Sequence, residues 1–388
     1  PLLAQRLRQA ARQGAEIHSL NALAEDWLMP VATQLTVAPS GWVGALADIA
    51  HCVAKAQGGT APFAGACSPQ AQAVAASLLN GTARSVLLGN AAAQHPQAST
   101  LLALAQWIAN ATGATFGYLG EAGNNVGAQL VNALPGAGGL NAGQMLTQPM
   151  KALLLLNVEP ELDAANAAAA RAALGGSGLV VALTPFRNAA ADVADVMLPI
   201  SPFTETAGTF VNAEGRVQSF QGVARPLGET RPAWKVLRVL GDMLGLPGFG
   251  QQSADEVLAE ALGDLTTLAA RLSNDAVLPP TLSADAVSGF ERIADVPIYA
   301  TDSLVRRALS LQLTADARAP QASLPSTLWS ELGLADGDKV RVSQGGAQAV
   351  LAARLDKTLA PTVVRVPAGH VLTAALGASF GAISVAKA

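Results

Sequence analysis

Few side chains in this chain are suited to acid–base or metal chemistry. There are four histidines and two cysteines, at positions His18, His51, His95, His370, Cys52 and Cys67. None of the histidines has a serine or cysteine partner at a spacing typical of nucleophilic catalysis. We therefore predict no catalytic residue and expect the histidines to be structural.

The two cysteines bear on metal binding and on redox state. No CxxC pair is present, and two cysteines are too few for a self-contained iron–sulfur cluster or a cysteine-rich zinc site. We predict no metal ligand in the chain. Because the chain has two cysteines, a disulfide between Cys52 and Cys67 is possible. The favoured interpretation is two inert thiols in a reducing compartment.

Several asparagine and threonine residues follow predicted strands or lie in glycine-rich loops. In open parallel sheets, ligands bind outside the carboxyl ends of the strands. Amide and hydroxyl groups at such ends could hold a large polar cofactor, but the same residues are common in ordinary turns, which is the favoured interpretation. With a histidine from a later loop, the candidates for a vestigial pocket are Asn90, Asn124, Asn125, Asn157, Thr184 and His370.

A glycine-rich run at 135–143 has a spacing close to that of dinucleotide-binding loops. Such a loop needs a strand before it and a helix after it, and Leu134-Pro135 is not a strand end. The run therefore predicts a surface turn. The basic pair Arg306-Arg307 predicts a solvated or interface contact.

Short apolar runs alternate with alanine-rich helical patterns over the first two-thirds of the chain. Lys151–Asn157 and Gly178–Thr184 are continuous apolar runs, as in parallel strands buried on both faces. A helix over Asp163–Leu174 between them completes a βαβ unit. The other predicted elements are helices Leu2–Arg12, Val43–Ala54 and Gln97–Thr112 and strands Ala15–Leu20, Ser85–Leu88 and Thr115–Leu119.

After about residue 200 the alternation of strands and helices ends. Residues 208–220 predict a hairpin with Gly215 at its turn. Thr230 is expected to cap a helix that runs to Leu244, and Ser253 is expected to begin another helix with a capping box. We predict an α/β region over 1–271, an irregular crossing segment over 272–323 and a small β-barrel over 324–388.

Charge and hydropathy narrow the function classes. Charged residues make up 13% of the 388 residues and the net charge is −4, and no basic cluster marks a nucleic-acid site. No apolar run reaches the roughly 18 residues of a membrane span. Because ordinary soluble domains are about 25% charged, we expect partner chains to cover part of the surface.

One stretch resembles a known family. Glu205–Gln218 (ETAGTFVNAEGRVQ) leads into Gly228–Gly241 (GETRPAWKVLRVLG). This is similar to the molybdopterin-oxidoreductase superfamily, and in this version to the G subunits of respiratory NADH:quinone oxidoreductases (complex I). Leu332–Arg341 and Val366–His370 resemble the dinucleotide-binding barrel of molybdenum enzymes. The resemblance implies α/β layers with parallel sheets followed by a C-terminal barrel of the double-psi type.

The resemblance also implies a role. This chain would be the carboxyl-terminal half of such a subunit. The first residue is Pro1 and not Met, from which we expect a piece of a longer polypeptide. The Fe–S clusters would lie before Pro1, and no cofactor is expected in this chain. Expected partners are the Fe–S portion and other peripheral-arm subunits at the cytoplasmic face of the inner membrane. The chain alone would be a non-catalytic scaffold; the alternative is part of a molybdenum- and pterin-dependent oxidoreductase such as formate dehydrogenase or nitrate reductase.

Overall fold

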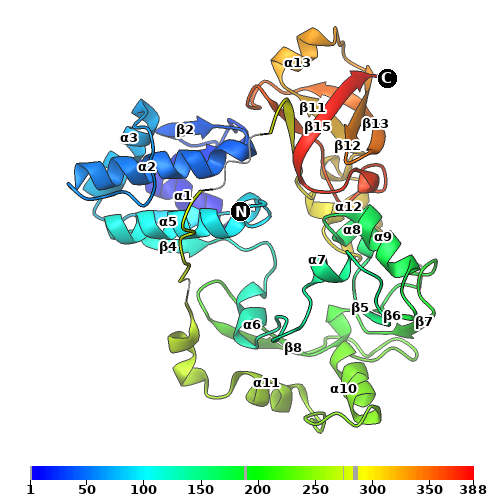
Figure 1. Ribbon diagram of the computed structural model, residues 1–388. Coiled ribbons are helices and arrows are strands. Elements are labelled where there is room, and N and C mark those ends of the chain that lie inside the picture. Colours follow the sequence, from blue (N-terminus) through cyan, green and yellow to red (C-terminus); the bar gives the residue numbers. More distant parts are fainter. Residues whose placement is uncertain (1, 188–189, 274, 283–286) are drawn as a thin grey trace.

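The computed structural model describes residues 2–187, 190–273, 275–282 and 287–388. Pro1 and residues 274 and 283–286 of the predicted crossing segment lie outside the described residues. Two layers with parallel strands, a hairpin region with its helices, and a closed barrel follow one another along the chain (Figure 1). The predicted fold class is confirmed.

The first layer packs three helices against two pairs of parallel strands. Helix α2 contacts both α3 and α5, and their shared core includes Ile49, Val53 and Ile108. Helix α5 ends at Gly113, whose φ of 67° favours glycine. The elements of this layer are α1 (Leu2–Arg12), β1 (His18–Asn21), β2 (Thr33–Thr36), α2 (Trp42–Ala56), α3 (Pro69–Asn80), β3 (Ser85–Leu88), α4 (Asn90–Ala93), α5 (Ala98–Thr112) and β4 (Thr115–Tyr118).

The second layer is a parallel sheet in the order β5-β6-β7. The central strand β6 is buried, but β5 lies at the edge and leaves Leu154 and Leu156 more than 40% exposed. The expectation that both runs are buried on both faces is therefore wrong for β5. Two helices also replace the single predicted one, because Asn166, not Asp163, caps the second. The elements are β5 (Leu153–Leu156), α8 (Pro160–Asp163), α9 (Ala167–Gly175), β6 (Val180–Thr184) and β7 (Val196–Pro199).

The predicted hairpin is confirmed, with Gly215 at a φ of 81°. The helix that follows starts after Pro232, and Thr230 does not cap it. The Thr230 hydroxyl instead donates to Leu227 O at 2.9 Å. Ser253 caps the next helix as expected. The elements are α6 (Asn125–Leu130), α7 (Ala142–Met145), β8 (Gly208–Val211), β9 (Val217–Phe220), α10 (Ala233–Met243) and α11 (Ala254–Leu262).

Six strands close the C-terminal barrel in the order β10-β14-β11-β13-β12-β15. Its first strand, β10, comes from segment 272–323, although the division of the chain into three regions stays a prediction. An apolar cluster that includes Leu23, Trp42, Val363 and Phe380 joins the barrel to the first layer. The elements are β10 (Phe290–Ile293), α12 (Leu309–Gln312), β11 (Gln321–Leu324), α13 (Ser326–Glu331), β12 (Lys339–Gln344), β13 (Ala347–Leu355), β14 (Val363–Arg365) and β15 (Phe380–Lys387).

Short 3-10 helices connect these elements. They are η1 (Pro39–Gly41), η2 (Phe203–Glu205), η3 (Leu265–Arg271), η4 (Ile298–Ala300), η5 (Val305–Arg307), η6 (Ala315–Ala317) and η7 (Ala374–Leu376). Within the described residues, none of the helices combines the length and apolar character needed to span a bilayer.

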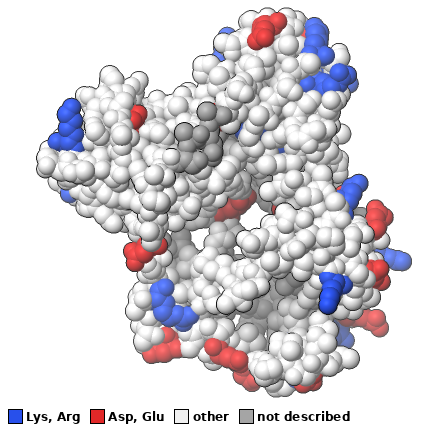
Figure 2. Space-filling model, in the orientation of Figure 1, with Lys and Arg blue, Asp and Glu red and all other residues white. Residues whose placement is uncertain are grey.

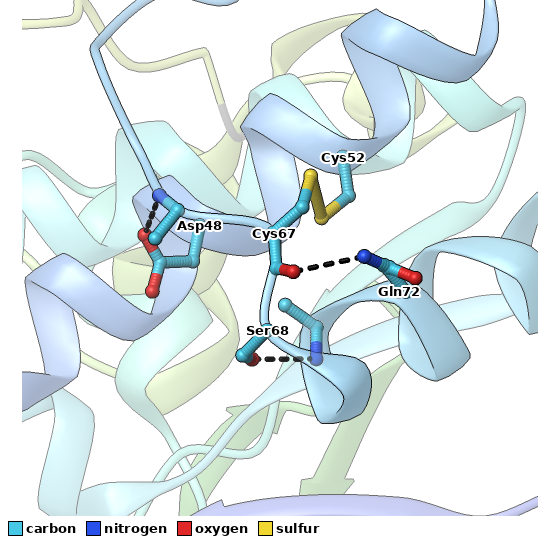
Figure 3. The surroundings of a disulfide bond; sticks show 7 residues. Asp48, Cys52, Cys67, Ser68 and Gln72 are labelled. Carbon is cyan, nitrogen blue, oxygen red and sulfur yellow. Dashed lines mark hydrogen bonds between the residues drawn. A yellow bond between two sulfur atoms is a disulfide. The ribbon is translucent and has the colours of Figure 1, made fainter.

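The cysteines correct an expectation. Cys52 on α2 and Cys67, just before α3, form a disulfide, where the sequence favoured two free thiols (Figure 3). Their Cα atoms lie 5.6 Å apart, within the usual range for a disulfide. The two cysteines meet because α2 and α3 pack side by side, a tertiary contact that residue counting does not reveal.

Candidate functional site

Two neighbouring hollows lie beside the barrel. One is about 200 Å³ and the other about 250 Å³. Arg365 of β14 lines both, and its Nε and Nη2 atoms donate to the Asp295 carboxylate at 2.9 Å each. The ion pair therefore stands between the two hollows. The space-filling view shows a deep hollow between the parts of the molecule on the face drawn (Figure 2).

The smaller hollow lies at the carboxyl ends of β3 and β4. Asn90, which follows β3 after Gly89, and Glu121, beyond β4, line it together with Gln94. The Gln94 amide donates to the Glu121 carboxylate at 2.8 Å. The strand-end rule thus places one predicted pocket residue, Asn90, in a hollow.

The larger hollow contains a second predicted residue, His370. Its Nδ1 accepts a hydrogen bond from the Leu372 amide at 3.1 Å. Burial lowers the pKa of His370 below its ordinary value and so favours the neutral ring. Because Nδ1 is the acceptor, the neutral ring carries its proton on Nε2.

A buried arginine inside the barrel fixes the loop that carries His370. The Arg292 side chain is fully buried and donates to Val366 O at 3.2 Å and to Ala378 O at 3.1 Å. Nη1 also donates to the Gln344 side-chain oxygen at 2.9 Å. Burial lowers the pKa of Arg292 to about 10, so the guanidinium stays charged at neutral pH and holds two loops through their carbonyl groups.

Asn157 and Thr184 lie at the carboxyl edge of the second sheet. They are neighbours, because Leu156 pairs with Leu183 and Asn157 N donates to Leu183 O at 2.8 Å. The buried Thr184 hydroxyl accepts from the Phe186 amide at 3.1 Å. Neither residue lines either hollow, so the structure does not bring them to the site of Asn90 and His370.

Asn124 and Asn125 also lie away from both hollows. The Asn124 side-chain oxygen accepts from the Val211 amide of β8 at 2.8 Å. This contact ties the start of α6 to the hairpin. Asn125 is exposed as the first residue of α6. Asn124 therefore has a structural role, which is to hold the hairpin against α6.

The remaining histidines, His18, His51 and His95, line neither hollow. His95 is buried, contacts Pro39 O through Nε2 at 3.0 Å and packs on Trp42 and Phe380. Burial lowers the pKa of His18, against the opposing charge of Glu16. His51 lies within α2.

A buried ion cluster was missed. The Glu159 carboxylate accepts from Arg306 Nη1 at 2.7 Å and from Arg307 Nη2 at 2.5 Å, and Arg306 also pairs with Asp163. The Arg307 guanidinium lies 4.5 Å from the centre of the Phe186 ring. Because the Arg306 side chain is only 10% exposed, the expectation of a solvated or interface pair is wrong. The partners are 143 to 148 residues apart, and no local signal links them.

Comparisons with known proteins place this geometry in a family. The chain is 33% identical over 225 residues to the G subunit of NADH-quinone oxidoreductase from Mycobacterium bovis, which covers 54% of the chain and 26% of that protein. The same subunit from Streptomyces coelicolor is 31% identical over 211 residues, covering 52% of the chain and 24% of that protein. A putative formate dehydrogenase of Staphylococcus aureus is 35% identical over 103 residues, covering 26% and 10%.

The matches to these G subunits therefore span about a quarter of those relatives. They confirm the resemblance predicted from the hairpin and the helix that follows it. Among solved structures, acetylene hydratase from Pelobacter acetylenicus superposes with a TM-score of 0.66 at 14% identity, covering 99% of this chain and 75% of that one, which shows a shared fold. The family model described as molybdopterin oxidoreductase matches residues 2–243, well over half of the chain, and this chain belongs to that family.

Proposed function

We propose that this chain is part of the G subunit of an NADH-quinone oxidoreductase and serves there as a redox-silent scaffold. The extent of the similarity carries the proposal: the match to a G subunit covers 54% of the chain, whereas the match to a putative formate dehydrogenase covers 26%. The scaffold would hold the Fe–S portion of the same subunit and neighbouring peripheral-arm subunits in place, at the cytoplasmic face of the inner membrane.

The donor groups of the chain support the absence of a redox role. Among the residues that the structure describes, no three His, Cys, Asp or Glu side chains are grouped to hold a metal ion. Both cysteines are used in the disulfide and supply no thiolate. Each hollow, at about 200 and 250 Å³, is also smaller than the roughly 300–1,000 Å³ of sites for drug-sized ligands. Neither hollow by itself therefore has the volume of a site for a whole pterin dinucleotide.

The sparse charge and exposed apolar side chains of the surface support the proposal that partner chains cover part of it. Figure 2 shows a face on which charged side chains are sparse and lie mainly at the periphery. Large apolar side chains are exposed on several elements, including Met243 at 79%, Leu309 at 81% and Leu313 at 88%. Exposed apolar surface of this kind is typical of interaction sites.

Metal analysis with co-purification tests the proposal. The tagged parent protein, purified from its native membranes, should co-purify with NADH-oxidising activity and contain iron. The chain of 388 residues expressed alone should contain neither molybdenum nor iron in stoichiometric amount. Stoichiometric metal in the chain alone would refute the redox-silent role, and a parent protein that purifies without NADH oxidation would refute the assignment to an NADH-quinone oxidoreductase.

The second candidate is a portion of a molybdenum- and pterin-dependent oxidoreductase. The 35% identity over 103 residues to a putative formate dehydrogenase favours it. Oxidative release of a bound pterin gives a fluorescent product, so the parent protein should fluoresce after oxidation if this candidate is right. A blank assay on the parent protein removes it.

A further inference from the structure

The larger hollow has a row of three aligned positions as one of its walls. Ser323 of β11 pairs with Arg354 of β13 on one side and with Arg365 of β14 on the other. Residues paired in register point to the same face of a sheet. Since neighbouring strands are about 4.8 Å apart, the two arginine backbones lie about 10 Å apart. All three residues line the hollow.

The guanidinium groups of this hollow have hydrogen-bonding capacity to spare. Arg365 uses Nε and Nη2 for Asp295, and a guanidinium has five N–H donors, so its Nη1 group is left over. Arg318, on the segment after η6, also lines the hollow. Within the described residues, the side chains of Arg318 and Arg354 make no hydrogen bond or ion pair. Both are exposed and are therefore accessible to a ligand from solvent.

Two residues with neutral donor groups and one carboxylate complete the lining. Tyr299 and His370 both line the hollow, and the His370 ring accepts at Nδ1, so its N–H donor is Nε2. The one acidic side chain in the lining is Asp316. The carboxylates of Asp295, Glu25 and Asp356 act on Arg365 from outside the lining. Arg318 and Arg354 share the lining with one carboxylate, that of Asp316, and these two guanidiniums therefore carry the excess of positive charge in the hollow.

We propose that this hollow binds a phosphate monoester, with Arg318 and Arg354 as its principal donors and Ser323 and Arg365 beside them. Arginine suits this ligand because its planar fork donates two parallel hydrogen bonds to phosphate oxygens. The volume of about 250 Å³ corresponds to about eight water molecules, more than inorganic phosphate fills. A small organic group joined to the phosphate, such as a sugar, occupies the rest. The proposal does not depend on the scaffold role.

Calorimetric titration at constant ionic strength tests the proposal on the full chain. Ribose 5-phosphate is the probe and inorganic phosphate the comparison, and ribose 5-phosphate should bind more tightly. Arg354→Gln and Arg318→Gln should each weaken the binding of ribose 5-phosphate about tenfold or more, as expected for a lost charge-assisted hydrogen bond. Arg341→Gln is the matched control, because Arg341 is an exposed arginine of the same barrel that lines neither hollow.

A second variant tests how the ion pair between Arg365 and Asp295 affects ligand binding. Asp295→Asn removes the carboxylate that competes for Arg365, so it should tighten the binding of ribose 5-phosphate, whereas a purely structural role would leave binding unchanged or weaken it. No heat with the unmodified chain at 10 mM of the probe (about the weakest useful affinity) would overturn the proposal. An equal loss in Arg341→Gln would also overturn it. Inorganic phosphate binding as tightly as ribose 5-phosphate would overturn the assignment to a monoester.

Discussion

Removing the disulfide should cost this protein a measurable part of its stability. We expect the double variant Cys52→Ala/Cys67→Ala to lower the free energy of unfolding by about 3 kcal/mol. The two cysteines are 15 residues apart in sequence, and closing a loop of that length in the unfolded chain is worth about 3 kcal/mol in the chain-entropy model. Loss of the buried Cys52 sulfur from the apolar core of α2, α3 and α5 adds about 1 kcal/mol at most.

The native structure should survive the change, because other contacts hold the segment between α2 and α3. The Asp48 carboxylate accepts from the Ala66 amide at 2.6 Å, and the Gln72 amide donates to Cys67 O at 2.8 Å. Ser68 caps α3 by accepting from the Ala71 amide at 3.1 Å (Figure 3). None of these bonds needs the sulfur atoms, so the main effect falls on the entropy of the unfolded chain.

Urea unfolding followed by circular dichroism measures the effect. If the free energy of unfolding falls by about 3 kcal/mol per molar urea, the urea concentration at the midpoint of unfolding should be about 1 M lower in the double variant. A dithiol reductant supplies the control: it should lower the midpoint of the unmodified chain by a similar amount and leave the double variant unchanged. A midpoint that neither the substitutions nor the reductant moves would refute the reasoning, as would two reactive thiols in the denatured, unreduced chain.

Three further predictions concern buried charged groups. Glu291→Gln should cost about 1.5–3 kcal/mol, because its carboxylate accepts from both the amide and the hydroxyl of Ser40; urea unfolding beside the exposed control Glu331→Gln checks this. Burial raises the pKa of Glu159, but hydrogen bonds from two arginines outweigh burial and leave it below 4.5. Its contribution should therefore be complete above pH 4.5 and be lost as pH falls further, so unfolding curves from pH 6 to pH 3 should converge for Glu159→Gln and the unmodified chain. Arg292→Met should destabilise the barrel by about 3 kcal/mol or more through unpaired carbonyl groups, and melting that matches the unmodified chain would contradict this.

The parts of the fold that were predictable carry local signals. Strand β3 was predicted to the residue, and β6 within two residues, because each is a short apolar run. Helix α5 ends where Gly113 permits a left-handed conformation. Helix α3 was missed although Ser68 and Pro69 are a typical helix start. That signal was present, but the segment lacks the strong apolar stripe that would have drawn attention to it.

Barrel strand β10 shows a limit of sequence patterns. Its two central residues, Glu291 and Arg292, are charged and yet buried at 4% and 0% exposure. Charged residues in sequence predict a solvated loop, and only the tertiary structure supplies the groups that pair with them. The carboxylate is bound by Ser40, which is 251 residues away in sequence, so no window of sequence could reveal the strand's environment.

Part of the candidate site could likewise be predicted from local sequence patterns, and part of it could not. Asn90 was predicted from its place after a strand and does line a hollow, because the strand-end rule follows from sheet topology. Asn157 and Thr184 satisfy the same rule but belong to a separate sheet, so they do not join it. How two sheets of one chain are oriented depends on packing between distant segments, which strand patterns do not encode.

Two buried contacts made by carboxylates connect regions that are far apart in sequence, one a pair of hydrogen bonds from a serine and the other an ion pair with arginine. Glu291 fixes the barrel to η1, directly before α2, and the pair of Glu159 with Arg306 fixes the second layer to the segment before β11. Buried ion pairs add little net stability compared with apolar packing, but they favour one geometry because a displaced partner leaves a charge unpaired. A chain that only had to be stable would gain more from apolar contacts at these positions. Buried carboxylate contacts at the junctions suit a body whose regions must keep a fixed relative orientation, which is the property that the proposed scaffold role requires.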